Sequence, residues 1–253
     1  MWNNPKPFSL FLIVSFLIAS MCSCNADDTG GKHVTQPDTA NVVSTAKTVL
    51  IYMAAQNSLG ARRNQQADSL EIMQAYKDIP GDSRILLFID DKYAPRIYRI
   101  DKTTPRPVMV KRWQNDEDSA SPAFFGELLS FIKRFYPSDE YGMVLWSHAT
   151  GWVPPSLALT RNAKQRHAKP LSFGIDDGED FGSDNGSEME IRDMAVVMKK
   201  ADFHARYIFF DACLMQNIEV VYELRHAADY IVGAPISTPG AGANYTNQIR
   251  KGL

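Results

Sequence analysis

The sequence TVLIYMA, residues 48–54, is a continuous apolar run that is rich in β-branched side chains. A run of this length and composition predicts a strand buried on both faces, because a strand with one solvated face would alternate apolar and polar residues. Two further runs have the same character, RILLFI at 84–89 and YGMVLW at 141–146. All three are therefore expected to be buried strands of one central sheet.

Segments of helical length separate the predicted strands. Helices are expected over 62–76, 122–135, 190–200 and 214–227, and the second has Ser121 as a candidate N-cap before Pro122. Further strands are expected at 207–210 and 230–234, with a hairpin at 96–100 and 108–113. Alternating strands and helices are typical of βα units, so the sequence predicts an α/β fold with a mostly parallel sheet.

Composition excludes several classes of protein. The 253 residues carry 27 Lys and Arg against 29 Asp and Glu, a net charge of −2, whereas nucleic-acid binding favours a clear basic excess. Three cysteines are too few for a disulfide scaffold or a cysteine-rich zinc module. We therefore expect an ordinary globular domain with no nucleic-acid partner.

The N-terminus has the features of an export signal. Lys6 precedes the apolar run 8–19, which is about as long as a signal h-region and too short for a comfortable membrane span. Small residues follow, then cysteines, as in a bacterial lipoprotein signal, and Cys24 fits as the lipidated residue better than Cys22. The alternative is a plain secretory signal with incidental cysteines.

Three regions of the chain are therefore expected. Residues 1–24 form the signal, residues 25–46 form a polar flexible tether, and residues 47–253 form the α/β domain. The protein is expected to be exported and anchored by its lipid at the outer membrane, the cell surface or the periplasmic face, or otherwise to be secreted.

Two potentially reactive side chains follow predicted strands directly. His148 comes after the strand at 141–146, and Cys213 comes after the strand at 207–210. Reactive groups of open α/β sheets collect at this carboxyl edge. Cys213 is expected at the start of the helix at 214–227, where free N–H groups and the helix dipole favour the thiolate. Structural roles stay open, because a free cysteine is commonly a small buried apolar residue.

An acidic, glycine-containing stretch occupies residues 174–184, GIDDGEDFGSD. Its carboxylates could bind a hard cation such as calcium, but their spacing does not match an EF-hand loop. A solvated acidic loop is the favoured interpretation.

Three blocks of sequence together resemble the clostripain family of cysteine peptidases. They are YMAAQNSL at 52–59, LWSHATGW at 145–152 and DACLMQNIEVVYELRHAADYIVGAP at 211–235. The GIDD motif at 174–177 and the Pro239-Gly240 turn also fit the family, and the resemblance runs from about residue 47 to the end.

The resemblance implies a caspase-like α/β/α sandwich and a cysteine endopeptidase that cleaves after Arg or Lys. Cys213 would form the acyl-enzyme, and His148 would protonate the leaving amine. Asp211 would bind the basic P1 side chain, although it could instead, or also, cap a helix that begins near Leu214. The N–H groups of Gly151 and Cys213 are candidate oxyanion donors. This chemistry requires no cofactor.

Members of the family are typically cleaved after a basic residue between the two catalytic residues. The basic loop 161–169 lies in that interval, and its candidate cleavage sites are Arg161, Lys164, Arg166 and Lys169. The partners implied are peptide or protein substrates, and a membrane through the N-terminal lipid.

The sequence also departs from the family pattern. Ala149 follows the histidine where Gly is usual, Gln56 stands where Asp is common, and family members normally continue well beyond Leu253. An incomplete C-terminus is therefore expected. The alternative function is a non-catalytic surface lipoprotein that serves as a binding module, and a peptide ligase using the same two residues is a remoter one.

Overall fold

The computed structural model of the chain describes residues 43–104, 106–151, 172–178 and 181–252. The predicted signal and tether lie outside these residues, as do the candidate lipidation sites Cys22 and Cys24. The candidate cleavage sites also lie outside them, namely Arg161, Lys164, Arg166 and Lys169. None of the helices within the described ranges is long and apolar enough to cross a membrane.

The central sheet has seven strands in the order β10-β9-β5-β1-β2-β3-β4. Five of them are parallel, namely β1 (Thr45–Ala54), β2 (Ser83–Asp90), β5 (Ser138–Trp146), β9 (Ala205–Asp211) and β10 (Ala228–Val232). The other two add as an antiparallel hairpin, β3 (Arg96–Ile100) and β4 (Val108–Arg112). The predicted α/β class, the mostly parallel sheet and the hairpin are confirmed.

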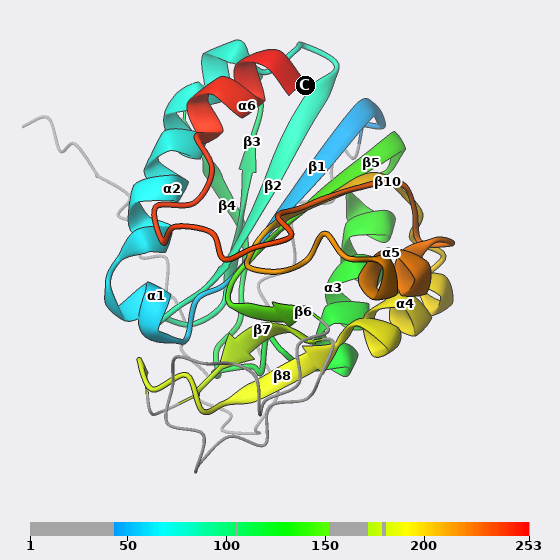
Figure 1. Cartoon of the computed structure of the whole chain (residues 1–253). Coiled ribbons are helices and arrows are strands. Elements are labelled where there is room, and N and C mark those ends of the chain that lie inside the picture. Colours follow the sequence, from blue (N-terminus) through cyan, green and yellow to red (C-terminus); the bar gives the residue numbers. More distant parts are fainter. Residues whose placement is uncertain (1–42, 105, 152–171, 179–180, 253) are drawn as a thin grey trace, which may run out of the picture. The chain divides into compact units, whose positions relative to one another are not determined.

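Both faces of the sheet are covered by helices, which makes three layers (Figure 1). Leu50, Tyr52 and Ala54 of β1 point into the core on one face, and the residues between them point into the core on the other. The first core is covered by α3 (Pro122–Phe135), α4 (Ile191–Lys200) and α5 (Ile218–Leu224). The second is covered by α1 (Ser58–Ala61), α2 (Asn64–Gln74), η2 (Ala75–Asp78) and α6 (Tyr245–Gly252).

A small antiparallel sheet follows β5 and was not predicted from the sequence. It has the strand order β6-β7-β8, with β6 (Ala149–Gly151), β7 (Ser172–Asp176) and β8 (Ser187–Glu190). The N–H of Gly174 in β7 donates to the carbonyl of His148 at 3.0 Å. The second sheet therefore fixes the backbone of a candidate catalytic residue.

The prediction of a helix from residue 214 is wrong at its start. Leu214 has a left-handed φ of 65°, and α5 begins only at Ile218, where Asn217 caps it by accepting from the Val220 N–H at 2.9 Å. Cys213 consequently lies in a turn, and Asp211 does not cap this helix. The argument that a helix N-terminus activates the thiol fails for the same reason.

Two smaller expectations also need correction. The helix predicted over 62–76 begins only at Asn64, because Arg63 has a φ of 65°, and it ends at Gln74, where the 3-10 helix η2 follows. Ser121 does precede α3 with Pro122 at its first turn, but its side chain makes no capping hydrogen bond.

Candidate active site

Strands β5 and β9 bring the two candidate catalytic residues to the same edge of the sheet. They are parallel neighbours, and their register pairs Trp146 with Asp211. His148 and Cys213 each lie two residues beyond this pair. Equivalent positions on adjacent parallel strands leave the sheet side by side, so the register places both residues at one site.

Gly151 brings the two segments that follow these strands into direct contact. It has a φ of 54°, and a Cβ atom built on it would lie only 2.3 Å from the carbonyl oxygen of Leu214. The segment after His148 therefore packs against the residue next to Cys213, at a separation that only glycine allows. By contrast, Ala149 lies in β6, paired with Phe173, and is not among the described non-glycine residues with positive φ.

Replacing Gly151 by Ala is expected to lower the free energy of unfolding by roughly 1–3 kcal/mol, because it adds backbone strain and a clash. Gly81→Ala is the matched control, since a Cβ on Gly81 would meet nothing within 4 Å. Urea denaturation of both variants measures the difference. Equal stability of the two variants would show that the close contact at Gly151 is not required.

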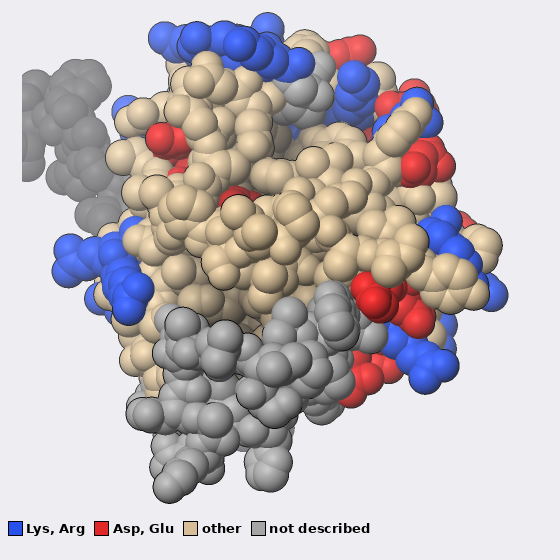
Figure 2. All heavy atoms as spheres, viewed as in Figure 1, with Lys and Arg blue, Asp and Glu red and all other residues tan. Residues whose placement is uncertain are grey.

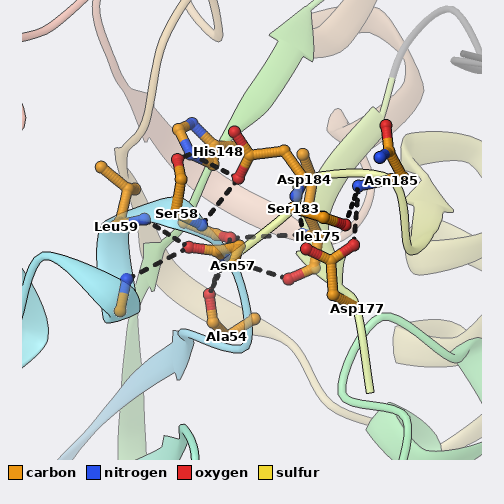
Figure 3. Close-up of polar contacts among 12 residues, drawn as sticks. Ala54, Asn57, Ser58, Leu59, His148, Ile175, Asp177, Ser183, Asp184 and Asn185 are labelled. Atoms are coloured by element: carbon orange, nitrogen blue, oxygen red, sulfur yellow. Dashed lines mark hydrogen bonds and ion pairs between the residues drawn. The ribbon is translucent and has the colours of Figure 1, made fainter. Parts of the chain in front are cut away.

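The imidazole of His148 is held on one side by two partners (Figure 3). Its Nε2 atom lies 3.0 Å from Ser58 Oγ and 3.2 Å from Asp184 Oδ1. The same Asp184 oxygen accepts from the Ser58 N–H at 2.7 Å. Among the described residues, both ring partners contact Nε2, which leaves Nδ1 to face a reacting group.

Asp184 carries a charge in this arrangement. Burial raises its pKa, but the hydrogen bond and charge of His148, together with the hydrogen bonds of Ser58, outweigh it and leave the pKa well below its usual range. Its side chain is 5% exposed and that of His148 is 17% exposed, so water screens the pair only weakly. An ionised carboxylate beside Nε2 can orient the imidazole and stabilise its protonated form.

The backbone around Asp184 is fixed by another carboxylate (Figure 3). Asp184 has a left-handed φ of 62°. Asp177 holds this conformation by accepting from the Asp184 N–H through Oδ2 and from the Asn185 N–H, at 2.6 Å, through Oδ1. The position of the carboxylate beside His148 is therefore set by a rigid turn.

Asn57 fixes the other partner of the histidine. Its side chain caps α1, accepting from the Leu59 N–H at 3.0 Å. The same side chain donates to the carbonyl of Ala54 at 2.9 Å and to that of Ile175 at 3.0 Å. Because Asn57 is fully buried and joins the ends of β1 and β7, Ser58 beside it has a defined place.

The thiol of Cys213 is partly exposed and contacts Thr238. Its Sγ atom accepts from the Thr238 N–H at 3.3 Å and lies 3.6 Å from Thr238 Oγ1. The turn is anchored where the Leu214 N–H donates to the carbonyl of Ile236 at 3.1 Å. Within the described residues no hydrogen bond joins Cys213 to His148, so the structure brings their segments together without direct contact of the two side chains.

The N–H of Cys213 is one of the two candidate oxyanion donors. In the described part of the chain it donates to no other residue. The second candidate, Gly151, pairs with Ser172 in the small sheet. Within the described residues, the N–H of Cys213 can therefore donate to a substrate oxygen without breaking an existing hydrogen bond.

Asp211 is the last residue of β9 and is buried. Its Oδ2 atom accepts from the Ala243 N–H at 3.0 Å and from the Tyr245 hydroxyl at 2.9 Å. Burial raises the pKa of this carboxyl, and the two hydrogen bonds only partly oppose the shift. A cation that approaches Asp211 would therefore stabilise its ionised form.

The acidic stretch 174–184 is not the solvated loop that was expected. Asp176 and Asp184 are buried, and Asp176 Oδ2 accepts from the N–H and the hydroxyl of Ser119 at 2.6 and 3.0 Å. These carboxylates bind protein donors instead of sharing one ligand. No group of three or more His, Cys, Asp or Glu among the described residues is arranged to hold a metal ion.

The interaction of Asp184 and Ser58 with the histidine was not predicted from the sequence. Asn57 before a short helix is a recognisable N-cap, and Asp184-Asn185-Gly186 is a recognisable turn signal. Both patterns predict local structure only, whereas the contact with His148 depends on the second sheet.

Comparison with known families and structures gives a consistent result. The peptidase C11 model, which describes the clostripain family, matches residues 51–252. A secreted C11 cysteine protease from Bacteroides thetaiotaomicron, solved with an irreversible peptide inhibitor, is 28% identical with a TM-score of 0.67, over 81% of this chain and 53% of that chain. An inactive zymogen C11 protease from Parabacteroides distasonis is 27% identical with a TM-score of 0.62, over 81% and 52%.

A structure of a secreted C11 cysteine protease from Bacteroides thetaiotaomicron called iotapain is alike in fold, at 23% identity and a TM-score of 0.66, over 83% of this chain and 58% of that chain. The chain thus spans a little over half the length of these structures. No curated protein matches it significantly. The likeness confirms the predicted caspase-like α/β/α fold.

Proposed function

Because this chain belongs to the clostripain family, we propose that it is a cysteine endopeptidase that cleaves after arginine or lysine. The observation that carries the proposal is the β5–β9 register, which brings the segments of His148 and Cys213 to one edge of the sheet. The contact of Gly151 with Leu214 supports the same arrangement.

In the proposed reaction, Cys213 Sγ attacks the carbonyl carbon of the scissile peptide. His148 accepts the proton of the thiol and gives it to the leaving amine as the C–N bond breaks. A water then attacks the acyl-enzyme, and His148 accepts a proton from this water and returns it to Sγ as the C–S bond breaks. The N–H of Cys213 donates to the developing oxyanion. The thiol leaves its contact with Thr238 when substrate aligns the site, since such geometry commonly tightens only in the complex.

Asp184 acts in this mechanism as a positioning residue. It holds Nε2 of His148, directs Nδ1 toward the substrate and stabilises the charge that the imidazole carries between the two proton transfers. Ser58 supports the same orientation through its hydroxyl.

Specificity for a basic P1 residue is assigned to Asp211. Its buried carboxylate lies two residues before Cys213 and would be stabilised in its ionised form by a guanidinium or ammonium group. The same specificity would allow the protein to cleave itself within 161–169.

Peptidyl substrates that differ only at P1 test the proposal. Under reducing conditions, substrates with Arg or Lys should be hydrolysed at least about a hundredfold faster than one with citrulline, which keeps the shape of Arg without its charge. A basic acyloxymethyl ketone should add to the tryptic peptide that contains Cys213. The absence of both turnover and labelling would contradict the proposed function.

A further inference from the structure

A second buried carboxylate lies beside Asp211. A Cβ atom built on Gly242 would be 2.8 Å from Asp211 Oδ2 and 3.2 Å from Asp68 Oδ2. Asp68 belongs to α2, and its Oδ2 atom accepts from the indole Nε1–H of Trp146 at 2.8 Å. Trp146 is the residue that pairs with Asp211 in the sheet, so the register itself brings the two carboxylates to one point.

Among the described residues, the charged groups that act on the two carboxylates are acidic. Asp68 and Asp211 are 4% and 8% exposed. The charged groups that act on Asp68 are Asp211 and Glu71, and both disfavour its ionised form. The other titratable neighbour, Tyr245, donates its hydroxyl to Asp211. A pair of buried carboxylates without a cation favours protonation and would be stabilised by a positive ligand.

Each carboxylate also keeps one oxygen available. No described residue donates a hydrogen bond to Oδ1 of Asp68 or to Oδ1 of Asp211. Neither oxygen belongs to the fully buried atoms that lack a hydrogen-bond partner. Gly242 has no side chain to fill the space between them and takes a φ of 62°. Figure 2 shows a small acidic area in a hollow near the centre of the molecular face, while Lys and Arg lie mostly toward its rim.

We propose that Asp68 is a second specificity-determining residue, which binds the basic P1 side chain together with Asp211. This inference rests on the proposed function, since it assigns a further residue to the same subsite. A guanidinium has five donors in a rigid planar fork and can bind two carboxylates at once, whereas an ammonium is a compact point charge. The pair therefore selects Arg over Lys.

Binding through this pair depends on pH in a defined direction. Burial, as the largest cause, raises the pKa of Asp68 from 3.8 to about 7. A basic ligand prefers the ionised carboxylate, so a bound proton competes with it. Affinity for an arginyl peptide should rise with pH toward about 7 and level off above it.

Binding to the Cys213→Ala variant, which separates affinity from cleavage, tests the inference. Acetylated peptide amides that end in Arg, Lys or citrulline are titrated calorimetrically from pH 5.5 to 8.5. At pH 8, adding Asp68→Asn should weaken Arg binding roughly tenfold to a hundredfold, weaken Lys binding less and leave citrulline unchanged. It should also remove the rise near pH 7, because asparagine still accepts from Trp146 but does not titrate.

Asp78→Asn provides the matched control. It removes a partly exposed carboxylate of η2 that pairs with Arg250 of α6 at 3.3 Å. Arg binding should be unchanged in this variant. The inference would be overturned if Asp68→Asn changed neither the affinity for the Arg peptide nor its pH profile. It would also be overturned if the protein bound the Arg and citrulline peptides equally well.

A second measurement needs no substitution at Asp68. In the free protein, the NMR resonance of the Trp146 indole N–H should change with pH with a midpoint near 7. The arginyl peptide should move this midpoint to lower pH, and the citrulline peptide should leave it unchanged. A resonance that does not respond to the arginyl peptide would contradict the pairing. A further outcome is that the wild-type protein, which retains Cys213, binds the Arg peptide selectively through Asp68 and yet does not hydrolyse it. That result would refute the proposed peptidase activity and leave this inference standing.

Discussion

Replacing Cys213 by Ala should lower kcat/KM for an arginyl peptide by at least about a thousandfold, because the variant has no nucleophile to form an acyl-enzyme. The fold should remain intact. The thiol is partly exposed and its hydrogen bonds are confined to Thr238, so its removal leaves no cavity in either core. The change should therefore separate chemistry from stability.

The measurement combines turnover, thermal denaturation and gel analysis of the purified chain. Wild-type protein should appear as fragments cut between Arg161 and Lys169, and the Ala variant should remain one chain. Thr238→Val is the matched control, because it keeps the side-chain shape and removes only the hydroxyl beside Sγ. Cleavage of the Ala variant during purification in a protease-deficient host would contradict self-processing, and retained turnover would contradict the nucleophile assignment.

Replacing Asp184 by Asn should lower kcat by about a hundredfold to ten-thousandfold, by analogy with the acidic member of the serine protease triad. Asparagine keeps the shape but removes the charge that stabilises protonated His148, and its amide can favour the wrong imidazole tautomer. KM for an arginyl peptide should change little, because Asp211 is untouched. A merely structural role would not produce this division between kcat and KM.

The chain contains a matched control for this change. Asp229 pairs with His204 Nε2 at 2.9 Å, and both side chains are largely exposed, at 42% and 56%. Asp229→Asn therefore removes the same kind of His–Asp pair away from the site and should leave kcat unchanged. Equal kcat values for the Asp184 and Asp229 variants would reject the positioning role of Asp184.

Most of the sheet could be predicted from the sequence, because its central strands are buried on both faces. TVLIYMA and RILLFI have no period that a helix would share, and both are strands in the structure. The start of α5 was missed because Leu214 adopts a left-handed conformation that its residue type does not suggest. That conformation is supported by the hydrogen bond of Leu214 to Ile236 on another segment, which no local pattern contains.

The site was predictable where it depends on strand ends and not where it depends on loops. His148 and Cys213 follow buried strands directly, so the order of elements was enough to place them at one edge. The role of Asp184 depends on its contact with a residue 36 positions away and on a turn held by Asp177. A cluster of acidic residues in sequence resembles a solvated loop unless the donors that bury it are known.

The pairing of β5 with β9 has a consequence for a chain cut within 161–169. The two strands lie on opposite sides of that interval in sequence and are joined in the middle of the sheet by a ladder from Gly142 to Trp146. A single cut would therefore yield two polypeptides that remain one folded body, each supplying strands that the other needs. Halves produced separately should be unable to fold alone and should reassemble when mixed, so the cut form would be a non-covalent pair of fragments from one chain.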